Sequence, residues 1–434
     1  MSQYVRKRSV SNGARTWMHV MVPYQIAYNP ISTIIALYIL ALHGSVIDVA
    51  YAATLANFII IPASIFWGEM VGKYNKRRFF INLSFIGLAL SLVGLYYSTN
   101  VIEVTLLYGF MSFMIMANST PLNLLIMETE PRERWSSAFS GLQMLSSMGS
   151  VVSLIFASIL AYAVSIRVLM LALVPFTVLA MLFAFPIPEP SVSIDRKTLT
   201  KIHPGQAHAY PGSGLYGLGL KDISRMYGSV KEIFRRSNFQ KLMLAIFAFY
   251  LATGLFNTAY PAGLKQSGIS DFWIFLIFAI STTMSMITFF ALEYVTPKLR
   301  DKNALSTSLI IRGSGYILIG LVFAVLGGVV FIGLNVIAYV FTSGLAYALF
   351  YTTMNAMVFR AVAGGTDKSY KLGIYSGAIG LGTLLGSLFA GYLSYFIGYW
   401  FTFAVAGSMI IACLFLFLDY LKPGDSASGL PVPS

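Results

Sequence analysis

The chain has 434 residues, of which 57% are hydrophobic and 10% are charged, and its formal net charge is +13. A soluble domain carries roughly 25% charged residues, so this composition excludes an ordinary soluble protein. The apolar runs are about 20 residues long, which is enough to cross a bilayer as helices. They do not alternate in units of about 10 residues, which excludes an outer-membrane barrel.

Twelve apolar segments predict twelve membrane-spanning helices. In chain order they cover residues 17–42, 48–68, 79–97, 101–126, 137–163, 166–185, 240–264, 272–294, 304–324, 328–357, 372–395 and 399–420. A basic N-terminal segment, residues 1–16, precedes the first span. That span is too long for the apolar core of a signal peptide, so we predict that it is not cleaved. A tail, residues 422–434, follows the last span.

Positive charge gathers at every second turn between these spans. Of the 29 Lys and Arg residues, 26 fall in the clusters Arg6–Arg15, Lys73–Arg78, Arg132–Arg134, Arg196–Lys241, Lys298–Lys302, Arg360–Lys371 and the single Lys422. Lys and Arg accumulate on the cytoplasmic side of membrane proteins. We therefore predict a multi-pass protein of the cell membrane with both termini in the cytoplasm. The charge serves topology and contact with anionic lipids, and nucleic acid is not an expected partner.

Residues 186–239 interrupt this pattern and form a predicted cytoplasmic central loop. Within it, residues 219–237 carry apolar side chains at helical spacing with Lys and Arg between them. This pattern is typical of a basic amphipathic helix on a membrane surface. The simpler interpretation is a topological anchor for the seventh span, and the alternative is a lipid-sensing element.

The central loop separates two sets of six spans, residues 17–185 and 240–421, which carry traces of a duplication. The traces are an acidic residue at the ends of spans 2 and 8, paired glycines in spans 5 and 11, and an Asn with a Pro in spans 1 and 7: Glu69 and Glu293, Gly141 and Gly149, Gly377 and Gly386, Asn29 and Pro30, Asn257 and Pro261. The offsets between corresponding positions range from 224 to 237 residues. This favours two related six-helix halves, the parallel-repeat plan of many secondary transporters.

The turn between spans 2 and 3 reads GEMVGKYNKRR, from Gly68 to Arg78. It resembles the signature loop of the major facilitator superfamily, in which a Gly is followed by an Asp, a basic residue, a second Gly and a basic run. Gly68 matches the first Gly and Lys73 matches the first basic residue. Lys76, Arg77 and Arg78 match the basic run.

Two positions of this turn depart from the family pattern. Gly72 stands where the family has an Asp that belongs to an inner-gate charge network, and this puts the network in doubt. Asn75 stands where the family has the second Gly, and Asn also tolerates left-handed backbone. The sequence from Glu128 to Arg134, before the glycine-containing span 5, resembles a second junction of the family. The resemblance implies an all-α integral membrane protein of twelve helices in two pseudo-symmetric six-helix halves, with cytoplasmic termini.

In this family, as the resemblance implies, spans 1, 2, 4, 5, 7, 8, 10 and 11 line a central cavity. Polar groups within a membrane are costly unless they pair or face water. We therefore predict that the mid-span polar residues bind substrate: Tyr24, Gln25, Tyr28, Asn29, Asn57, Asn118, Asn123, Gln143, Asn257, Tyr260, Ser343, Tyr347 and Tyr351. Amides and phenols suit an uncharged or weakly charged organic solute. For each single residue, interhelical hydrogen bonding is the alternative.

Charged side chains within the spans are few. None of the 16 acidic residues lies at mid-span, which argues against a simple cation/proton antiporter. Glu103 is the remaining proton-linked candidate, and an interfacial acid is its simpler interpretation. Arg312 lies well inside span 9, where we expect it to snorkel or to pair with Glu293, with binding of an anionic substrate as the alternative. The His residues form no ligand cluster, and no metal or cofactor is predicted.

Together these features favour a secondary active transporter, not an enzyme, that moves a small organic solute by alternating access. A monomer in contact with membrane lipids is expected. Coupling to protons or another ion is left open. A membrane-embedded enzyme acting on lipids or glycans is one alternative, which would need acids and His at one interface. A transport-inactive sensor on the same fold is the other, because the motif Asp is missing at Gly72.

Overall fold

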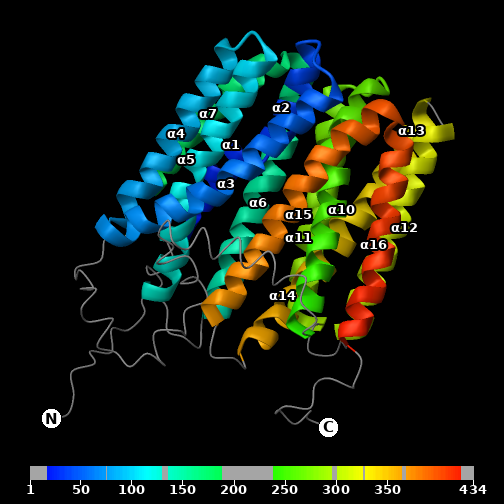
Figure 1. Ribbon diagram of the computed structural model, residues 1–434. Coiled ribbons are helices and arrows are strands. Elements are labelled where there is room, and N and C mark those ends of the chain that lie inside the picture. Colours follow the sequence, from blue (N-terminus) through cyan, green and yellow to red (C-terminus); the bar gives the residue numbers. More distant parts are fainter. Residues whose placement is uncertain are drawn as a thin grey trace.

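The computed structural model describes residues 17–74, 76–129, 135–187, 238–295, 301–325, 328–363 and 368–421. Nearly all of this part is helical, and the helices run side by side in two bundles (Figure 1). The predicted N-terminal segment, the amphipathic helix at 219–237, Arg134 and the tail lie outside the described residues.

The first half contains six spans. Span 1 consists of α1 (Met21–Tyr28) and α2 (Ile31–Ala41), and the others are α3 (Val46–Tyr74), α4 (Arg77–Tyr97), α5 (Val101–Thr129), α6 (Trp135–Ala163) and α7 (Ile166–Phe183). Span 1 is divided at Pro30, because proline has no backbone N–H to continue the helical ladder. Asn29 and Pro30 keep right-handed helical dihedrals, so the two pieces form one crossing.

The second half contains α10 (Asn238–Gln266), α11 (Asp271–Val295), α12 (Asp301–Val325), α15 (Lys368–Phe396) and α16 (Tyr399–Tyr420). Its remaining crossing, span 10, begins as α13 (Gly328–Tyr339) and ends as α14 (Tyr347–Ala363). Between them lies η5 (Val340–Ala346), a π-helical segment that is not among the predicted elements. Such wider turns often mark functional positions in helices.

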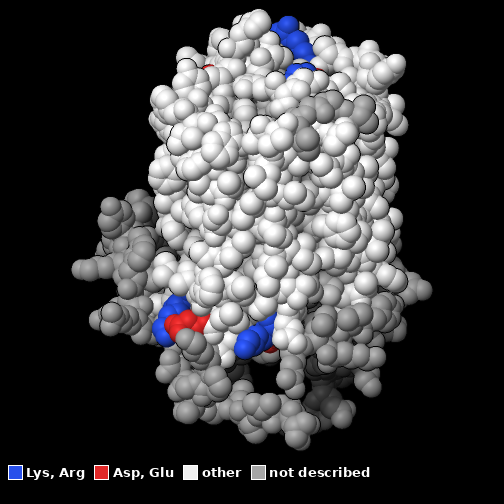
Figure 2. Space-filling view, turned by 90° about the vertical axis from the view of Figure 1, so that its right-hand side faces the viewer, with Lys and Arg blue, Asp and Glu red and all other residues white. Residues whose placement is uncertain are grey.

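Charged side chains are concentrated at the two ends of the bundle. Figure 2 shows a wide uncharged band between them on one face of the molecule. Within the described residues, eleven helical stretches are long and apolar enough to cross a membrane, and α1 with α2 adds the crossing that completes the predicted twelve. We call the end that carries Lys73, Arg78 and Lys241 the basic face. The opposite end, with the turns at 42–45, 98–100 and 267–270, is the far face.

The signature turn is mostly helical. Gly68 lies inside α3, which runs to Tyr74 rather than ending at residue 68 as predicted. The ammonium group of Lys73 lies 5.4 Å from the centre of the Tyr74 ring. Lys76 is exposed and immediately precedes α4. Most of the motif is therefore helical, and the two long helices end and begin within it at Tyr74 and Arg77.

Two arginines of this turn hold its helices in place. Arg77 is buried, and its guanidinium donates a 3.4 Å hydrogen bond to the carbonyl oxygen of Val71 in the last turn of α3. A cation is favourable there because a helix C-terminus carries partial negative charge. The Arg78 guanidinium lies 4.2 Å from the centre of the Phe185 ring, just past α7. These contacts do not require an acidic side chain at Gly72.

Gly149 of α6 and Gly386 of α15 make equivalent close contacts in the two halves. A Cβ atom on Gly149 would lie 2.7 Å from a carbonyl oxygen of α1, and a Cβ atom on Gly386 would collide with a carbonyl oxygen of α10. Both glycines let helix backbones approach closely. A Cβ atom on Gly141 or Gly377 would have no neighbour within 4 Å. Only the second glycine of each predicted pair packs in this way.

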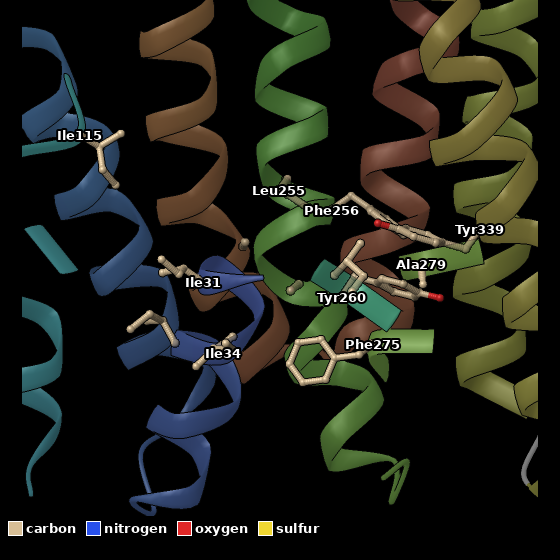
Figure 3. Packing of buried hydrophobic residues seen from close by; sticks show 14 of the residues in the cluster. Ile31, Ile34, Ile115, Leu255, Phe256, Tyr260, Phe275, Ala279 and Tyr339 are labelled. Atoms are coloured by element: carbon tan, nitrogen blue, oxygen red, sulfur yellow. The ribbon is translucent and has the colours of Figure 1, made fainter. Parts of the chain in front are cut away.

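An aromatic stack forms the core of the second half. The ring of Tyr260 lies 4.9 Å from that of Phe256 and 4.6 Å from that of Tyr339, and Figure 3 shows these three side chains together. Tyr260 is completely buried, and its hydroxyl donates to Oδ1 of Asn335 at 3.3 Å. In this conformation Tyr260 lies in the core of the second half, and its role as a cavity residue stays a prediction. Its ring packs against other rings, and its hydroxyl is satisfied inside the protein.

We expect Gly386→Ala to lower the Tm of the purified protein, whereas Gly377→Ala on the same helix leaves it unchanged or raises it slightly. The methyl group at 386 meets backbone, and overpacking of this kind costs about 1–3 kcal/mol. At 377 the methyl group meets open space and replaces a glycine that destabilises a helix by roughly 0.5–1 kcal/mol. Thermal unfolding in detergent measures both effects, and equal Tm values would contradict the packing role of Gly386.

Candidate functional site

The two halves meet along helix pairs that the repeat relates to each other. Span 2 (α3) packs against span 11 (α15), and span 5 (α6) packs against span 8 (α11). A shift of six spans converts the first pair into the second, as expected for two six-span halves around a twofold axis. Span 1 contacts span 7 through α2 and α10. The centre of the protein is therefore bordered by span 1 from one half and span 7 from the other.

Polar contacts close the far-face part of the α3–α15 interface. The hydroxyl oxygens of Tyr51 and Tyr392 are 2.6 Å apart. The Asn57 amide donates to the Ser387 hydroxyl at 3.2 Å, and the Thr258 hydroxyl of α10 donates to the same oxygen at 3.0 Å. On α3 these contacts use residues 51–57 of a helix that continues to residue 74. Asn57, a predicted cavity residue, thus belongs to the closure between the halves.

The α6–α11 interface is closed at the same level. The Ser158 hydroxyl donates to the carbonyl oxygen of Phe272 at 2.9 Å, and the ring of Tyr162 lies edge-on to the Phe272 ring with centres 6.1 Å apart. Both contacts lie at the far-face ends of their helices. Between described residues, no hydrogen bond or ring contact joins the halves at the basic-face ends. In this conformation the halves are held together at the far face.

Two polar side chains are exposed in the middle of otherwise buried stretches. Ser32 is the only residue of 30–39 in span 1 that is not buried, and Asn257 is the only such residue of 252–264 in α10. A single exposed position on a central helix indicates that the side chain faces an internal space rather than lipid. The positions differ by 225 residues, whereas Asn29 and Pro30 of span 1 precede Asn257 and Pro261 of span 7 by 228 and 231 residues, so Ser32 and Asn257 lie about one helical turn from exact repeat equivalence. Each half therefore places one exposed polar group on its central span.

Four half-buried tyrosines gather on the basic-face side of Asn257. They come from α10, α14 and α15 and form what we call the tyrosine cluster: Tyr250, Tyr347, Tyr351 and Tyr375. The rings of Tyr347 and Tyr351 are 5.8 Å apart, and the side chains of Tyr250 and Tyr375 lie near both. The Tyr375 hydroxyl donates to Oδ1 of Asn355 at 2.8 Å. Each phenol can donate and accept a hydrogen bond, so the cluster offers several polar groups to one ligand.

Only half of this cluster was predicted from the sequence. Tyr347 and Tyr351 are among the predicted cavity residues, whereas Tyr250 and Tyr375 are not. The helical period could have found Tyr250, which precedes Asn257 by seven residues, or about two turns, and so shares its face. Tyr375 precedes Gly382 by seven residues, or about two turns, and so shares its face of α15. Because Gly382 packs against the α10 backbone, the same spacing could have found Tyr375.

The polar residues of span 1 divide between core and interior. Tyr24 is buried, and its ring stacks on Tyr28 at 5.5 Å and lies 5.4 Å from Phe85 of α4. In this conformation its ring is covered within the first half, and its role as a cavity residue stays a prediction. Tyr28, Gln25 and Asn29 are half-buried and stay candidates for the interior.

The other predicted cavity residues do not form a single group. Asn118 is buried in α5, Ser343 is half-buried in η5, and Gln143 is exposed on α6. The side chains of Asn123, Glu128 and Glu293 lie outside the described residues.

Arg312 is buried inside the second half, with 2% of its surface exposed. Its Nη1 donates to the carbonyl oxygen of Thr342 in η5 at 3.2 Å. The guanidinium carbon lies 5.3 Å from the ring centre of Phe249 and 5.2 Å from those of Tyr316 and Tyr347. Arg312 does not snorkel in this conformation, because its cation lies near three aromatic rings, which attract it. The side chain of Glu293, its other expected partner, lies outside the described residues. No ion pair to Arg312 is found among the described residues.

Glu103 has a structural explanation at the far face. One of its carboxylate oxygens accepts a 2.8 Å hydrogen bond from the Thr99 N–H, and its own N–H donates to Oδ1 of Asn100 at 2.9 Å. This is a capping box at the start of α5, which satisfies backbone donors at a helix N-terminus. The geometry agrees with the interfacial interpretation of Glu103. Across the described ranges, no group of three or more His, Cys, Asp or Glu side chains could hold a metal ion.

Comparisons with known proteins agree with this architecture. A solved structure of the nucleoside transporter NupG has 14% identity and a TM-score of 0.66, with 95% of this chain and 100% of that chain covered. A POT family transporter in complex with 5-aminolevulinic acid has 13% identity and a TM-score of 0.67, with 94% and 96% covered. At such low identity these structures establish the fold alone. A search of curated proteins finds no match.

The family model described as Major Facilitator Superfamily matches residues 20–362 and 242–433, and so spans both halves. It agrees with the twelve crossings, the repeat-related interfaces and the turn at Gly68–Arg78. The chain belongs to the Major Facilitator Superfamily.

Proposed function

We propose that this membrane transport protein is a secondary active transporter that moves a small organic solute by alternating access between its halves. The observation that carries the proposal is the pair Ser32 and Asn257. Each is a lone exposed polar residue on an otherwise buried stretch, and the two lie on spans 1 and 7, which border the centre of the protein. Transporters with internal repeats bind substrate near the bilayer midplane at the interface of the repeats.

The far-face contacts suit an interface that opens and closes. Between described residues they consist of hydroxyl and amide hydrogen bonds and ring contacts, without an ion pair. A hydrogen bond of this kind contributes only about 0.5–1.5 kcal/mol net. Within each half, by contrast, Gly149 and Gly386 fix backbone against backbone. The halves can therefore move as bodies while the contacts between them exchange.

We assign the basic face to the cytoplasm, because Lys and Arg accumulate on that side of membrane proteins. The segments 1–16, 186–239 and 422–434 would then also be cytoplasmic, and the two bundles would cover residues 17–185 and 240–421. With the far face closed, the central site would be reached from the cytoplasm in this conformation.

The polar groups at the centre suit a solute with several hydrogen-bonding atoms. Ser32 and Asn257 supply a hydroxyl and an amide, and the tyrosine cluster supplies phenols next to aromatic faces. The transporters of similar fold act on nucleosides or hold 5-aminolevulinic acid, which are small polar organic molecules. This supports a solute of similar size without selecting one of these compounds.

Cysteine labelling tests the position of Ser32 and Asn257. The chain has one cysteine, the buried Cys413, so Cys413→Ala provides a background without thiols. In that background we expect Ser32→Cys and Asn257→Cys to react with a membrane-impermeant maleimide in inside-out vesicles faster than in right-side-out vesicles. The matched control, Ala259→Cys, lies two residues further along α10 at a fully buried position and should stay unlabelled. Labelling of Ala259→Cys at the rate of Asn257→Cys would contradict an internal space at Asn257.

A reversible crosslink tests alternating access. Tyr51 and Tyr392 are both exposed and face each other across the halves. We expect a disulfide-containing bis-maleimide to join Tyr51→Cys and Tyr392→Cys in the cysteine-free background. Solute flux into proteoliposomes should then stop and return after reduction, because the far face can no longer open. The solute is selected beforehand by its effect on Tm, since a ligand of the folded state raises stability.

Each single-cysteine variant, treated in the same way, is the control for this crosslink and should retain flux. Undiminished flux through the crosslinked double variant would rule out opening of the far face as a step of transport. Absence of flux for every solute tested in the wild-type protein would favour the sensor alternative.

A further inference from the structure

The buried Arg312 carries a charge that the described residues do not neutralise. Its polar contact is a hydrogen bond from Nη1 to the carbonyl oxygen of Thr342, and its Nε has no hydrogen-bond partner. The acidic residues of the described helices in this half lie at helix ends, such as Asp301 at the start of α12. A buried cation loses its hydration, and aromatic faces and a carbonyl oxygen attract it without neutralising its charge. The site therefore favours an incoming negative charge.

The surroundings hold the guanidinium in one place. In η5 and the residue before it, carbonyl oxygens accept hydrogen bonds from side chains of neighbouring helices. Ser281 donates to Tyr339, Ser285 donates to Ser343 and to Gly344, and Arg312 donates to Thr342. A π-helical segment departs from the regular ladder and leaves such carbonyls available. Arg312 is thus fixed between span 9 and span 10.

Tyr347 connects this charge to the interior. One side of its ring lies 5.2 Å from the Arg312 guanidinium carbon, and its ring centre is 5.8 Å from that of Tyr351 in the tyrosine cluster. Tyr347 is half-buried, whereas Arg312 is covered. The Tyr250 side chain also lies near Arg312. A ligand among the four tyrosines would therefore form hydrogen bonds directly with phenol hydroxyls. It would also lie in the positive electrostatic potential of Arg312, from which Tyr347 separates it.

We infer that the tyrosine cluster binds the carboxylate or another anionic group of the transported solute, with Arg312 as the buried source of positive potential. This inference rests on the proposed function and narrows its substrate class. It shifts the sequence-based expectation of an uncharged or weakly charged solute toward an organic anion. Neutral phenols donate hydrogen bonds to a carboxylate, and such charge-assisted bonds are stronger than neutral ones. Within the described spans, no acidic side chain near the cluster would oppose an anion.

A purely structural role of Arg312 makes a different prediction. If Arg312 only held η5 in place, its replacement would weaken binding of charged and neutral ligands alike, together with stability. If it supplies positive potential, its replacement changes the preference between a carboxylate and a neutral analogue of the same shape. The ratio of the two affinities therefore separates the two roles.

The test uses acetate, lactate, benzoate and nicotinate, each paired with its primary amide. Binding to the purified full-length protein is followed by Tm and by calorimetry, and flux is followed in proteoliposomes. We expect at least one carboxylate to bind better than its amide. Arg312→Gln should reduce that preference on the order of tenfold, as expected for loss of a nearby charge at an effective dielectric constant of about 20. Arg312→Lys, which keeps the charge, should retain most of the preference.

A second variant covers the case in which Arg312→Gln does not fold. Tyr347→Phe keeps the ring that lies against Arg312 and removes only the hydroxyl, so it should reduce carboxylate binding while leaving Tm nearly unchanged. Phe323→Tyr, which adds a hydroxyl within the aromatic core of the same half, is the control and should not alter the preference.

The outcomes separate this inference from the proposed function. Flux of amides but not of carboxylates, or an unchanged preference in both Arg312→Gln and Tyr347→Phe, would overturn the inference while transport stands. No stabilisation and no flux with any compound of either kind would overturn transport of such solutes altogether.

Discussion

The structure depends on the requirement that a polar group inside a membrane bundle finds a partner within the protein. Most hydroxyls in the described helices meet it locally. Ser91, for example, donates to the carbonyl oxygen of Gly87 one turn earlier. Others meet it between helices, as when Ser153 of α6 donates to the carbonyl oxygen of Ile26 in α1. Among the exceptions are the exposed Ser32 and Asn257, and Arg312, whose charge has no counter-ion among the described residues and whose Nε has no hydrogen-bond partner there.

The same requirement explains why span 10 is irregular. Regular helix would close the carbonyls of residues 339–344 within the helix itself. The π-helical segment instead offers them to Ser281, Ser285 and Arg312 of the adjoining spans. Span 10 thus gives up regular backbone hydrogen bonds and gains hydrogen bonds to neighbouring helices. Tyr347, directly after this segment, lies between the buried Arg312 and the other tyrosines of the cluster. The feature that departs most from ideal geometry is therefore also the one that links a supporting helix to the central site.

The crossings could be predicted from sequence because they follow from the length and apolarity of each run, and α15 and α16 begin and end close to the predicted positions. The repeat was visible in Gly149 and Gly386, since close backbone contact demands glycine. The site was predicted less well, because burial depends on which way a side chain faces. Tyr260 and Tyr347 are both mid-span tyrosines, yet one lies in the aromatic core and the other on the cluster. The π-helical segment has no signal in composition, since it results from contacts with neighbouring helices.

Mechanical and chemical features are distributed differently over the two halves. Gly149 and Gly386 give both halves the same close packing, and the spans 2–11 and 5–8 give both the same interface. The guanidinium and the four tyrosines, however, all belong to the second half. In the first half, the corresponding span 3 has the fully buried Leu88 in its middle and no buried cation among its described mid-span residues. A solute held mainly by one half can stay bound while the other half moves across it. Similar packing in both halves, with the proposed binding groups in one of them, would therefore let the proposed site change its accessibility while the solute stays bound.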